Sequence, residues 1–183
     1  MQLSNVKVAA LATTGFEEVE YTKPKQALED AGATVHLVSP ASGSIKAWDG
    51  DDWGGEHTVD VNLSNADASD YDALLLPGGV LSPDSLRIND AALSFVKAFF
   101  RSDKPVAVIC HGGQTLISAG LVKGRTMTGY VSVRPDLANA GAKVQDQEVV
   151  VDGKLVSSRN PDDIPAFNKK MIEVFAGKSA SVA

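Results

Sequence analysis

The chain contains one cysteine, Cys110, in a position where a nucleophile could be displayed. It follows the apolar run 105–109, which reads as a buried strand, and precedes His111 and the glycine pair 112–113, which open a helix. This order predicts a strand-to-helix elbow that lifts the sulfur out of the sheet. Unpaired N–H groups and the helix dipole favour the thiolate there, so we expect a lowered thiol pKa. The alternative is a small buried side chain at the end of a strand.

Two kinds of side chain could move the proton of that thiol. His111 is its sequence neighbour and could act as the base, and a surface histidine at a helix start is the alternative. Three carboxylates, Glu17, Glu18 and Glu20, stand at the start of another expected helix. Compensation of the helix dipole explains Glu17 and Glu18. Glu20 lies one turn further in, where a protonated carboxyl could donate a hydrogen bond to a thiolate.

Glycines at the end of a neighbouring strand could complete such a site. The run 71–76 reads as another buried strand and stops at Pro77, Gly78 and Gly79. Backbone N–H groups of Gly78, Gly79 and His111 could hold a developing oxyanion beside the sulfur. A tight turn without a catalytic role is the alternative.

Strands and helices alternate along the chain, as in a parallel sheet that is covered on both faces. Strands are expected over 6–12, 34–38, 71–76, 105–109, 149–151 and 155–156, helices over 17–31, 89–102, 114–119 and 164–175, and a glycine-rich hairpin over 43–62. Pro24 predicts a bend or restart in the first helix. The sequence predicts an α/β, flavodoxin-like three-layer sandwich with ligands at the carboxyl ends of the strands. We expect one domain over 1–176 and a disordered tail over 177–183.

Length and composition limit the class of protein. The 183 residues suit one domain, and 44% hydrophobic and 22% charged residues suit a globular core. A net charge of −6 without a basic run argues against a nucleic-acid partner. No apolar stretch reaches the roughly 18 residues that cross a bilayer, and the first residues lack a signal-peptide pattern. A single cysteine cannot form an internal disulfide, which predicts a cytoplasmic protein. No two histidines are spaced as a ligand pair, so we expect no metal, and we expect no cofactor.

Four separated segments resemble one family. They are 15–20, 72–79, 108–112 and 157–167, and the resemblance extends from about Val6 to Phe175. The chain resembles the PfpI family, the intracellular-protease and general-stress-protein branch of the DJ/PfpI superfamily, which is related to class I glutamine amidotransferases. Gly113 departs from this family, in which proline is usual after His-Gly.

The resemblance implies a role for each matching residue. Cys110 is then the nucleophile, His111 its neighbouring histidine, Glu20 the carboxyl that contacts the sulfur, and Tyr130 a pocket residue. In the protease branch a third acidic residue of the triad comes from a neighbouring subunit. By position this residue is Asp84, where family members carry glutamate. We therefore expect a homodimer or a larger ring of dimers.

Several activities are associated with the superfamily, and all need a reactive thiolate in a small pocket. We expect a stress-response enzyme, a glyoxalase/deglycase-type hydrolase acting on small carbonyl compounds or on glycated protein or nucleotide, because a peptide substrate would need a long cleft. Peptide hydrolysis by an intracellular cysteine peptidase is one alternative, and a non-catalytic sensor that works through Cys110 oxidation is another. A flavodoxin-like binding domain is disfavoured, because the first strand-end turn lacks a phosphate-binding glycine pattern.

Overall fold

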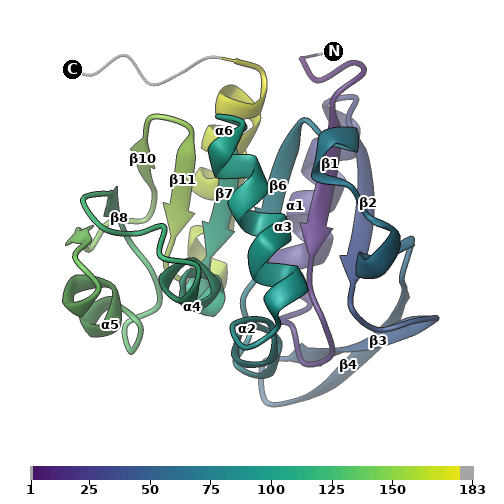
Figure 1. Ribbon diagram of the computed structural model, residues 1–183, viewed down its shortest axis with the longest axis horizontal. Coiled ribbons are helices and arrows are strands. Elements are labelled where there is room, and N and C mark those ends of the chain that lie inside the picture. Colours follow the sequence, from purple (N-terminus) through teal and green to yellow (C-terminus); the bar gives the residue numbers. More distant parts are fainter. Residues whose placement is uncertain (1, 178–183) are drawn as a thin grey trace.

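The computed structural model describes residues 2–177, and a seven-stranded sheet runs through it in the order β10-β11-β7-β6-β1-β2-β5 (Figure 1). The strands are β1 (Lys7–Leu11), β2 (Thr34–Ser39), β5 (Val61–Asn62), β6 (Ala73–Leu76), β7 (Val106–Ile109), β10 (Val150–Asp152) and β11 (Leu155–Ser158). Neighbouring strands pair in parallel except β10, which runs antiparallel to β11. Of the tail expected to be disordered, residues 178–183 lie outside the described residues.

Helices cover both faces of this sheet and give the fold three layers (Figure 1). One face carries α1 (Val19–Asp30) and α6 (Ile164–Phe175), and the other carries α3 (Asp90–Arg101) and α4 (Gly113–Ser118). The short helix α2 (Leu81–Leu86) follows β6 at the carboxyl ends of the strands. Within residues 2–177, no helix has the length and apolar character needed to cross a membrane.

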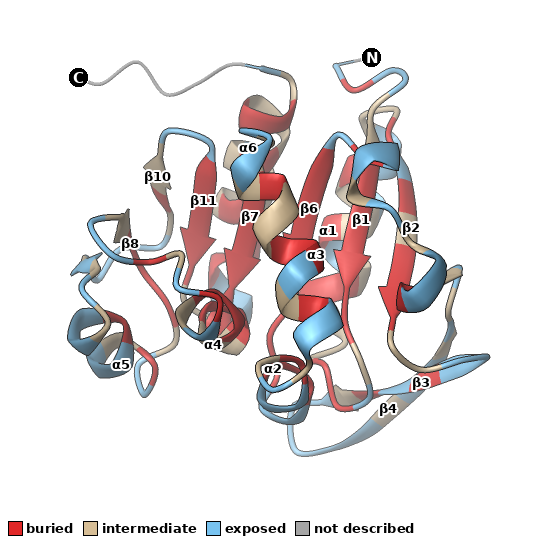
Figure 2. Cartoon of the chain, in the orientation of Figure 1, coloured by how far each residue is buried: buried red, intermediate tan, exposed pale blue. Residues whose placement is uncertain are grey.

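Both faces of the sheet are covered by helices, which explains why its strands are continuously apolar and do not alternate between apolar and polar residues. Along β1, Val8 and Ala10 belong to the core beneath α1 and α6, whereas Ala9 and Leu11 belong to the core beneath α3. Side chains on a strand point to opposite faces in turn, so a strand covered on both sides buries every position. Figure 2 shows the central strands buried along their length. The predicted sandwich with a mostly parallel sheet is confirmed.

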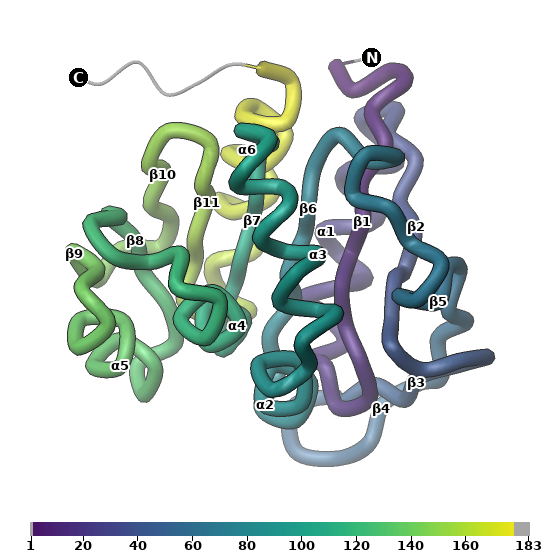
Figure 3. Tube along the Cα trace, in the orientation of Figure 1, coloured from purple at the N-terminus to yellow at the C-terminus, as the bar shows by residue number. Residues whose placement is uncertain are grey.

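Several short elements differ from the expectations. The hairpin expected over 43–62 comprises antiparallel strands β3 (Ser44–Asp49) and β4 (Asp52–Thr58), but β5 joins the main sheet instead. The first helix begins at Val19 rather than residue 17 and continues through Pro24 as one element. Beyond β7, β8 (Thr126–Met127), α5 (Arg134–Asn139) and β9 (Lys143–Val144) lie beside the β10 end of the sheet (Figure 3).

Candidate active site

Cys110 stands at the predicted elbow between β7 and α4. A single 3₁₀ turn, Cys110–Gly112, joins the strand to the helix. The cysteine has φ = 62°, a left-handed conformation that costs a non-glycine residue about 1 kcal/mol or more. A Cβ at Gly112 would lie 2.8 Å from the carbonyl oxygen of Leu76 and 2.9 Å from Val108. The elbow therefore needs glycine at 112 so that the turn can pack against the two strands.

Glu20 meets Cys110 in the protein interior, as the resemblance implied. Its side chain is fully buried, and its Oε2 accepts a hydrogen bond from the Gly78 N–H at 2.8 Å. Its Oε1 has no hydrogen-bond partner of regular geometry in residues 2–177, and the carboxyl interacts with the Cys110 thiol. A Cβ at Gly78 would lie 2.5 Å from Glu20 Oε2 and 2.7 Å from the Cβ of Cys110. The absent side chain of Gly78 is what lets the two groups meet.

Burial controls the protonation of this pair. It raises the pKa of Glu20 to about 8, against smaller downward effects of Cys110 and the Gly78 N–H. Burial also raises the pKa of the Cys110 thiol, the Glu20 carboxylate raises it further, and the N–H groups of Gly79 and His111 lower it. This direction is opposite to the low thiol pKa expected from the helix start alone, because burial outweighs the backbone donors. The pair therefore retains a proton near neutral pH and titrates as one unit.

His111 lies close enough to exchange a proton with the sulfur. Its Nδ1 is 3.1 Å from Cys110 Sγ, so the elbow brings two adjacent side chains together. The imidazole stacks on Tyr130 with ring centroids 4.5 Å apart, and the Tyr130 N–H donates to the Cys110 carbonyl at 3.1 Å. Burial lowers the pKa of His111, which favours the neutral imidazole that a base requires. Ser132 Oγ lies 3.5 Å from Nε2 on the other side of the ring.

The backbone donors differ in part from those predicted. The Gly79 and His111 N–H groups face the sulfur of Cys110, as expected. The Gly78 N–H is taken by Glu20 and is not free to hold an oxyanion. The sequence could not show this, because the assignment depends on how α1 packs against the turn after β6.

These groups open into a cavity of about 500 Å³. Its lining includes Cys110, Glu20, His111 and Tyr130 from the predicted site, together with the exposed apolar side chains of Val80 and Leu81. Asp84 is not part of this lining; it is exposed on α2. Within one chain the structure therefore unites all the predicted side chains except Asp84.

The β3–β4 hairpin forms a wall of the cavity that the sequence did not reveal. Trp48 and Gly50 of this hairpin line the cavity beside Glu17. Glu17 Oε1 accepts from the Gly50 N–H at 3.0 Å, and Glu18 Oε1 contacts His57 Nε2 at 2.7 Å. Both carboxylates therefore anchor the hairpin, a role beyond the helix-dipole compensation expected for them. They precede the first residue of α1, Val19.

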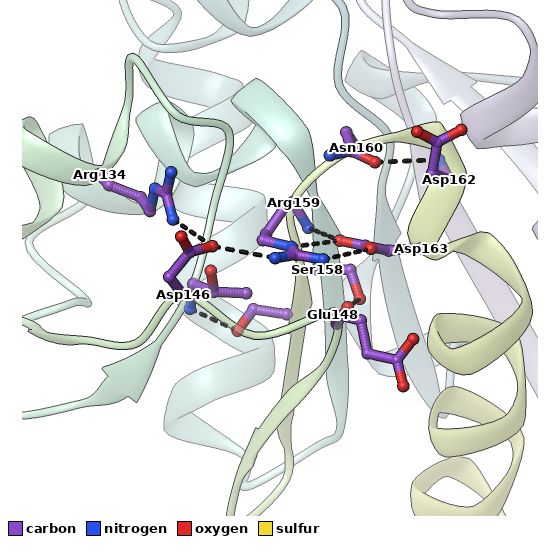
Figure 4. Close-up of polar contacts among 10 residues, drawn as sticks. Arg134, Asp146, Glu148, Ser158, Arg159, Asn160, Asp162 and Asp163 are labelled. Carbon is purple, nitrogen blue, oxygen red and sulfur yellow. Dashed lines mark hydrogen bonds and ion pairs between the residues drawn. The ribbon is translucent and has the colours of Figure 1, made fainter.

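Pro161 also lines the cavity, and a network of charged side chains surrounds the segment that carries it. Figure 4 shows this network. Asp163 is 3% exposed and accepts three hydrogen bonds from Arg159, from its backbone N–H at 3.0 Å and from Nε and a terminal nitrogen, each at 2.9 Å. Arg159 also contacts Asp146 at 3.0 Å, and Asp146 pairs with Arg134, the first residue of α5. The network ties the loop that carries Pro161 to the β8–β9 region.

Among residues 2–177, no three His, Cys, Asp or Glu side chains cluster as metal ligands would. The site offers instead a thiol, a carboxyl with a raised pKa, an imidazole and two backbone donors. Such a set can add a thiolate to a carbonyl carbon and move the protons that the addition requires.

Comparison with known proteins finds relatives over nearly the whole chain. The model of the DJ-1/PfpI family matches residues 6–174. "Putative cysteine protease YraA" of Bacillus subtilis (strain 168) is 48% identical over 172 residues, which are 92% of this chain and 97% of the relative. General stress protein 18 of the same organism is 47% identical over 167 residues, 91% of this chain and 95% of the relative. The crystal structure of Drosophila melanogaster DJ-1beta aligns with a TM-score of 0.85 and 27% identity, covering 94% of this chain and 91% of that one. The chain belongs to the DJ-1/PfpI family.

Proposed function

We propose that the protein is a stress-response enzyme of glyoxalase/deglycase type, in which Cys110 attacks glyoxal-derived carbonyl adducts. The observation that carries the proposal is the placement of Cys110 Sγ, 3.1 Å from His111 Nδ1 and against the buried Glu20 carboxyl, in a cavity of about 500 Å³. A cavity of this size suits a small carbonyl compound or the end of a modified side chain. A long peptide would need an extended groove.

The shared proton of the buried pair provides the first step. Burial raises the pKa of both groups, so the form of the pair that has lost one proton is a minor one near neutral pH. In this reactive form we place the remaining proton on Glu20 and the negative charge on Cys110, because two N–H groups face the sulfur and one faces the Glu20 carboxyl. The thiolate adds to the aldehyde carbon of methylglyoxal, a C–S bond forms, and the carbonyl electron pair moves onto oxygen. The Gly79 and His111 N–H groups stabilise this oxyanion until Glu20 protonates it.

The later steps need a base, and His111 serves as that base. It takes the proton from the carbon bonded to sulfur, and a proton returns at the neighbouring ketone carbon. The first carbon is thereby oxidised to a thioester and the second is reduced to an alcohol. Water then cleaves the C–S bond and restores the thiol. One methylglyoxal and one water give one lactate, with no external oxidant or reductant.

The test measures lactate formed from methylglyoxal, free and as its adduct with a small thiol. The parent protein should produce lactate, and Cys110→Ala should not. His111→Ala should retain Cys110 alkylation but lose most of the turnover, because the addition survives and the proton transfer does not. No lactate above the Cys110→Ala background would refute the proposal.

A peptidase with a triad completed across subunits is the second candidate. Asp84 is exposed on α2, next to the exposed apolar side chains of Val80, Leu81 and Ile88, and a second copy packed there would place an acid near the cavity mouth. Sedimentation should then show a dimer or a larger ring. A fluorogenic peptide should be cleaved by the parent and not by Cys110→Ala or Asp84→Ala. A monomer at all concentrations removes Asp84 from the mechanism.

A redox sensor is the third candidate, because Cys110 is the only cysteine in the sequence and has no second thiol to form an internal disulfide. Oxidation would then stop at sulfenic acid or continue to sulfinic acid. Mass spectrometry after mild peroxide should show two added oxygens on Cys110 before any methionine is oxidised. Earlier oxidation of a methionine contradicts this role.

A further inference from the structure

The cavity that contains Cys110 holds negative charge and no positive side chain. Two acids line it, Glu17 and Glu20, and no lysine or arginine among residues 2–177 does. His111 is the one basic group in the lining, and burial lowers its pKa, so it is neutral near pH 7. Burial raises the pKa of Glu20 to about 8, so the Glu20–Cys110 pair carries at most one negative charge near neutral pH, on the sulfur when Cys110 is a thiolate, and Glu17 supplies the other. An anionic ligand therefore meets repulsion in this cavity without a cation to offset it.

Glu17 is held in a fixed position at the cavity, where its carboxylate can contact a bound cation. Its backbone N–H donates to the Gly78 carbonyl at 3.1 Å, which fixes the residue beside the turn that Glu20 and Cys110 share. Its Oε1 accepts from the Gly50 N–H at 3.0 Å, and no hydrogen bond to Oε2 is found in the described part of the chain. Burial raises the pKa of Glu17, so its carboxylate is incompletely solvated. Such a group gains more from a bound cation than a fully hydrated one does.

Aromatic rings in the same lining favour the same ligand charge. Trp48 of the hairpin and Tyr130 beside His111 both line the cavity. The faces of such rings attract ammonium and guanidinium groups, most strongly where water is excluded. A carboxylate combined with aromatic walls is a recurrent way of binding an organic cation.

We propose that this cavity selects positively charged carbonyl compounds, which carry an ammonium or guanidinium group near the reacting carbon, and that Glu17 is the residue that recognises the charge. The inference rests on the proposed function and narrows its substrate class. Carbonyl adducts of amine- or guanidine-bearing side chains then react well. Adducts of nucleotides, which carry phosphate, and of glutathione, which is anionic, react poorly.

The test uses the thiol as a probe and needs no turnover. Cys110 is modified with two charged methanethiosulfonates of similar size, trimethylammonioethyl and sulfonatoethyl, and with the smaller neutral methyl reagent. Each rate is divided by the rate for a small free thiol, which removes the intrinsic reactivity of the reagents. The corrected cation-to-anion rate ratio should be about tenfold or more at low salt and should fall as salt is added.

Two variants assign this preference to Glu17. Glu17→Gln keeps an acceptor for the Gly50 N–H and removes the charge, so the corrected ratio should fall by about threefold or more. Glu18→Gln is the matched control, since it removes the same charge one residue away, where the carboxylate contacts His57 and Gly55 outside the cavity lining. Its ratio should stay within about twofold of the parent. Equal effects of the two variants, or no preference and no salt dependence in the parent, overturn the proposal.

The readout separates this inference from the enzymatic one. Charge preference without lactate formation contradicts the proposed activity and leaves the cation site standing. Lactate formation without charge preference supports the proposed activity and contradicts the cation site. Because the salt dependence of the parent protein needs no substitution, the inference remains testable if Glu17→Gln folds poorly.

Discussion

The buried carboxyl of Glu20 and the side chain of Cys110 converge on the Cα of Gly78, where a Cβ would lie 2.5 Å from Glu20 Oε2 and 2.7 Å from the Cys110 Cβ. Deprotonation of either group is unfavourable in this buried space, because burial raises the pKa of both. The chemistry of the site therefore depends on which of the two holds the proton. Three structural features control that choice: the burial of Glu20, the glycine at 78 and the backbone donors at 79 and 111.

Glu20 should make the protein less stable as the pH rises. Its pKa is about 8 in the folded protein and near the ordinary 4.5 in the unfolded chain, so unfolding releases a proton between these values. Stability falls with pH in that window by up to about 1.4 kcal/mol per unit, and the dependence ends below and above it. In a Cys110→Ala background, which removes the coupling, adding Glu20→Gln should remove the part of this pH dependence that Glu20 contributes. Urea unfolding at pH 5 and pH 7.5 should show the stability difference between the two proteins changing by more than about 1 kcal/mol.

Two glycines near Cys110 should respond to alanine in opposite ways. Gly78→Ala would force its Cβ into Glu20 and Cys110, so it should lower the free energy of unfolding by about 1–3 kcal/mol and separate the pair. Gly113 has φ = −58°, and a Cβ there would meet Leu137 at 3.5 Å, an ordinary contact. Gly113→Ala should therefore raise stability by about 0.5–1 kcal/mol, since glycine is costly in a helix. Thermal and urea unfolding measure both, and a stable Gly78→Ala protein with unchanged thiol reactivity would contradict the close packing described.

The long elements were predictable because local pattern and final environment agree. The helix expected over 164–175 has the same bounds in the structure, and its Pro165 stands in the first turn, where proline is tolerated. Buried parallel strands were recognisable from their continuous apolar runs. The six-residue helices α2 and α5 were missed because so few residues carry little periodic signal. Pro24 predicts a bend or restart, whereas in the structure α1 continues through this buried proline as one helix.

The sequence could predict only those parts of the site that directly follow the ends of adjacent strands. The elbow at Cys110 and the turn after β6 could be placed side by side from the sequence, because adjacent parallel strands end at the same edge. The hydrogen bond from the Gly78 N–H to Glu20 could not be predicted from the sequence, since it depends on the packing of α1. The role of Glu17 required knowing that the hairpin folds back over the site, a contact between segments more than 30 residues apart.

The charged network behind Pro161 should depend on its buried member more than on its exposed one. Asp163 is buried and accepts three hydrogen bonds from Arg159, so Asp163→Asn should lower the free energy of unfolding by about 1–3 kcal/mol. Asp146 has a side chain that is 63% exposed, and Asp146→Asn should cost clearly less, because water and salt screen its two ion pairs. Urea unfolding of the two variants gives the comparison. Equal losses would show that the four side chains act as one unit.

The protonation of the Glu20–Cys110 pair can be measured through the rate of Cys110 alkylation against pH. If protonated Glu20 donates to the thiolate, Glu20→Gln keeps a donor of similar shape and should leave reactivity at neutral pH within about tenfold of the parent. Glu20→Leu keeps the bulk but removes the donor, so burial acts on the sulfur alone and the thiol pKa should rise by more than about one unit. The parent should show two coupled steps that the Gln variant reduces to one. Circular dichroism controls for folding, and alkylation of Cys110 in His111→Ala separates the effect of the imidazole. If Gln and Leu behave alike, the carboxyl has no part in forming the thiolate, and the Gly79 and His111 N–H groups must overcome burial without it.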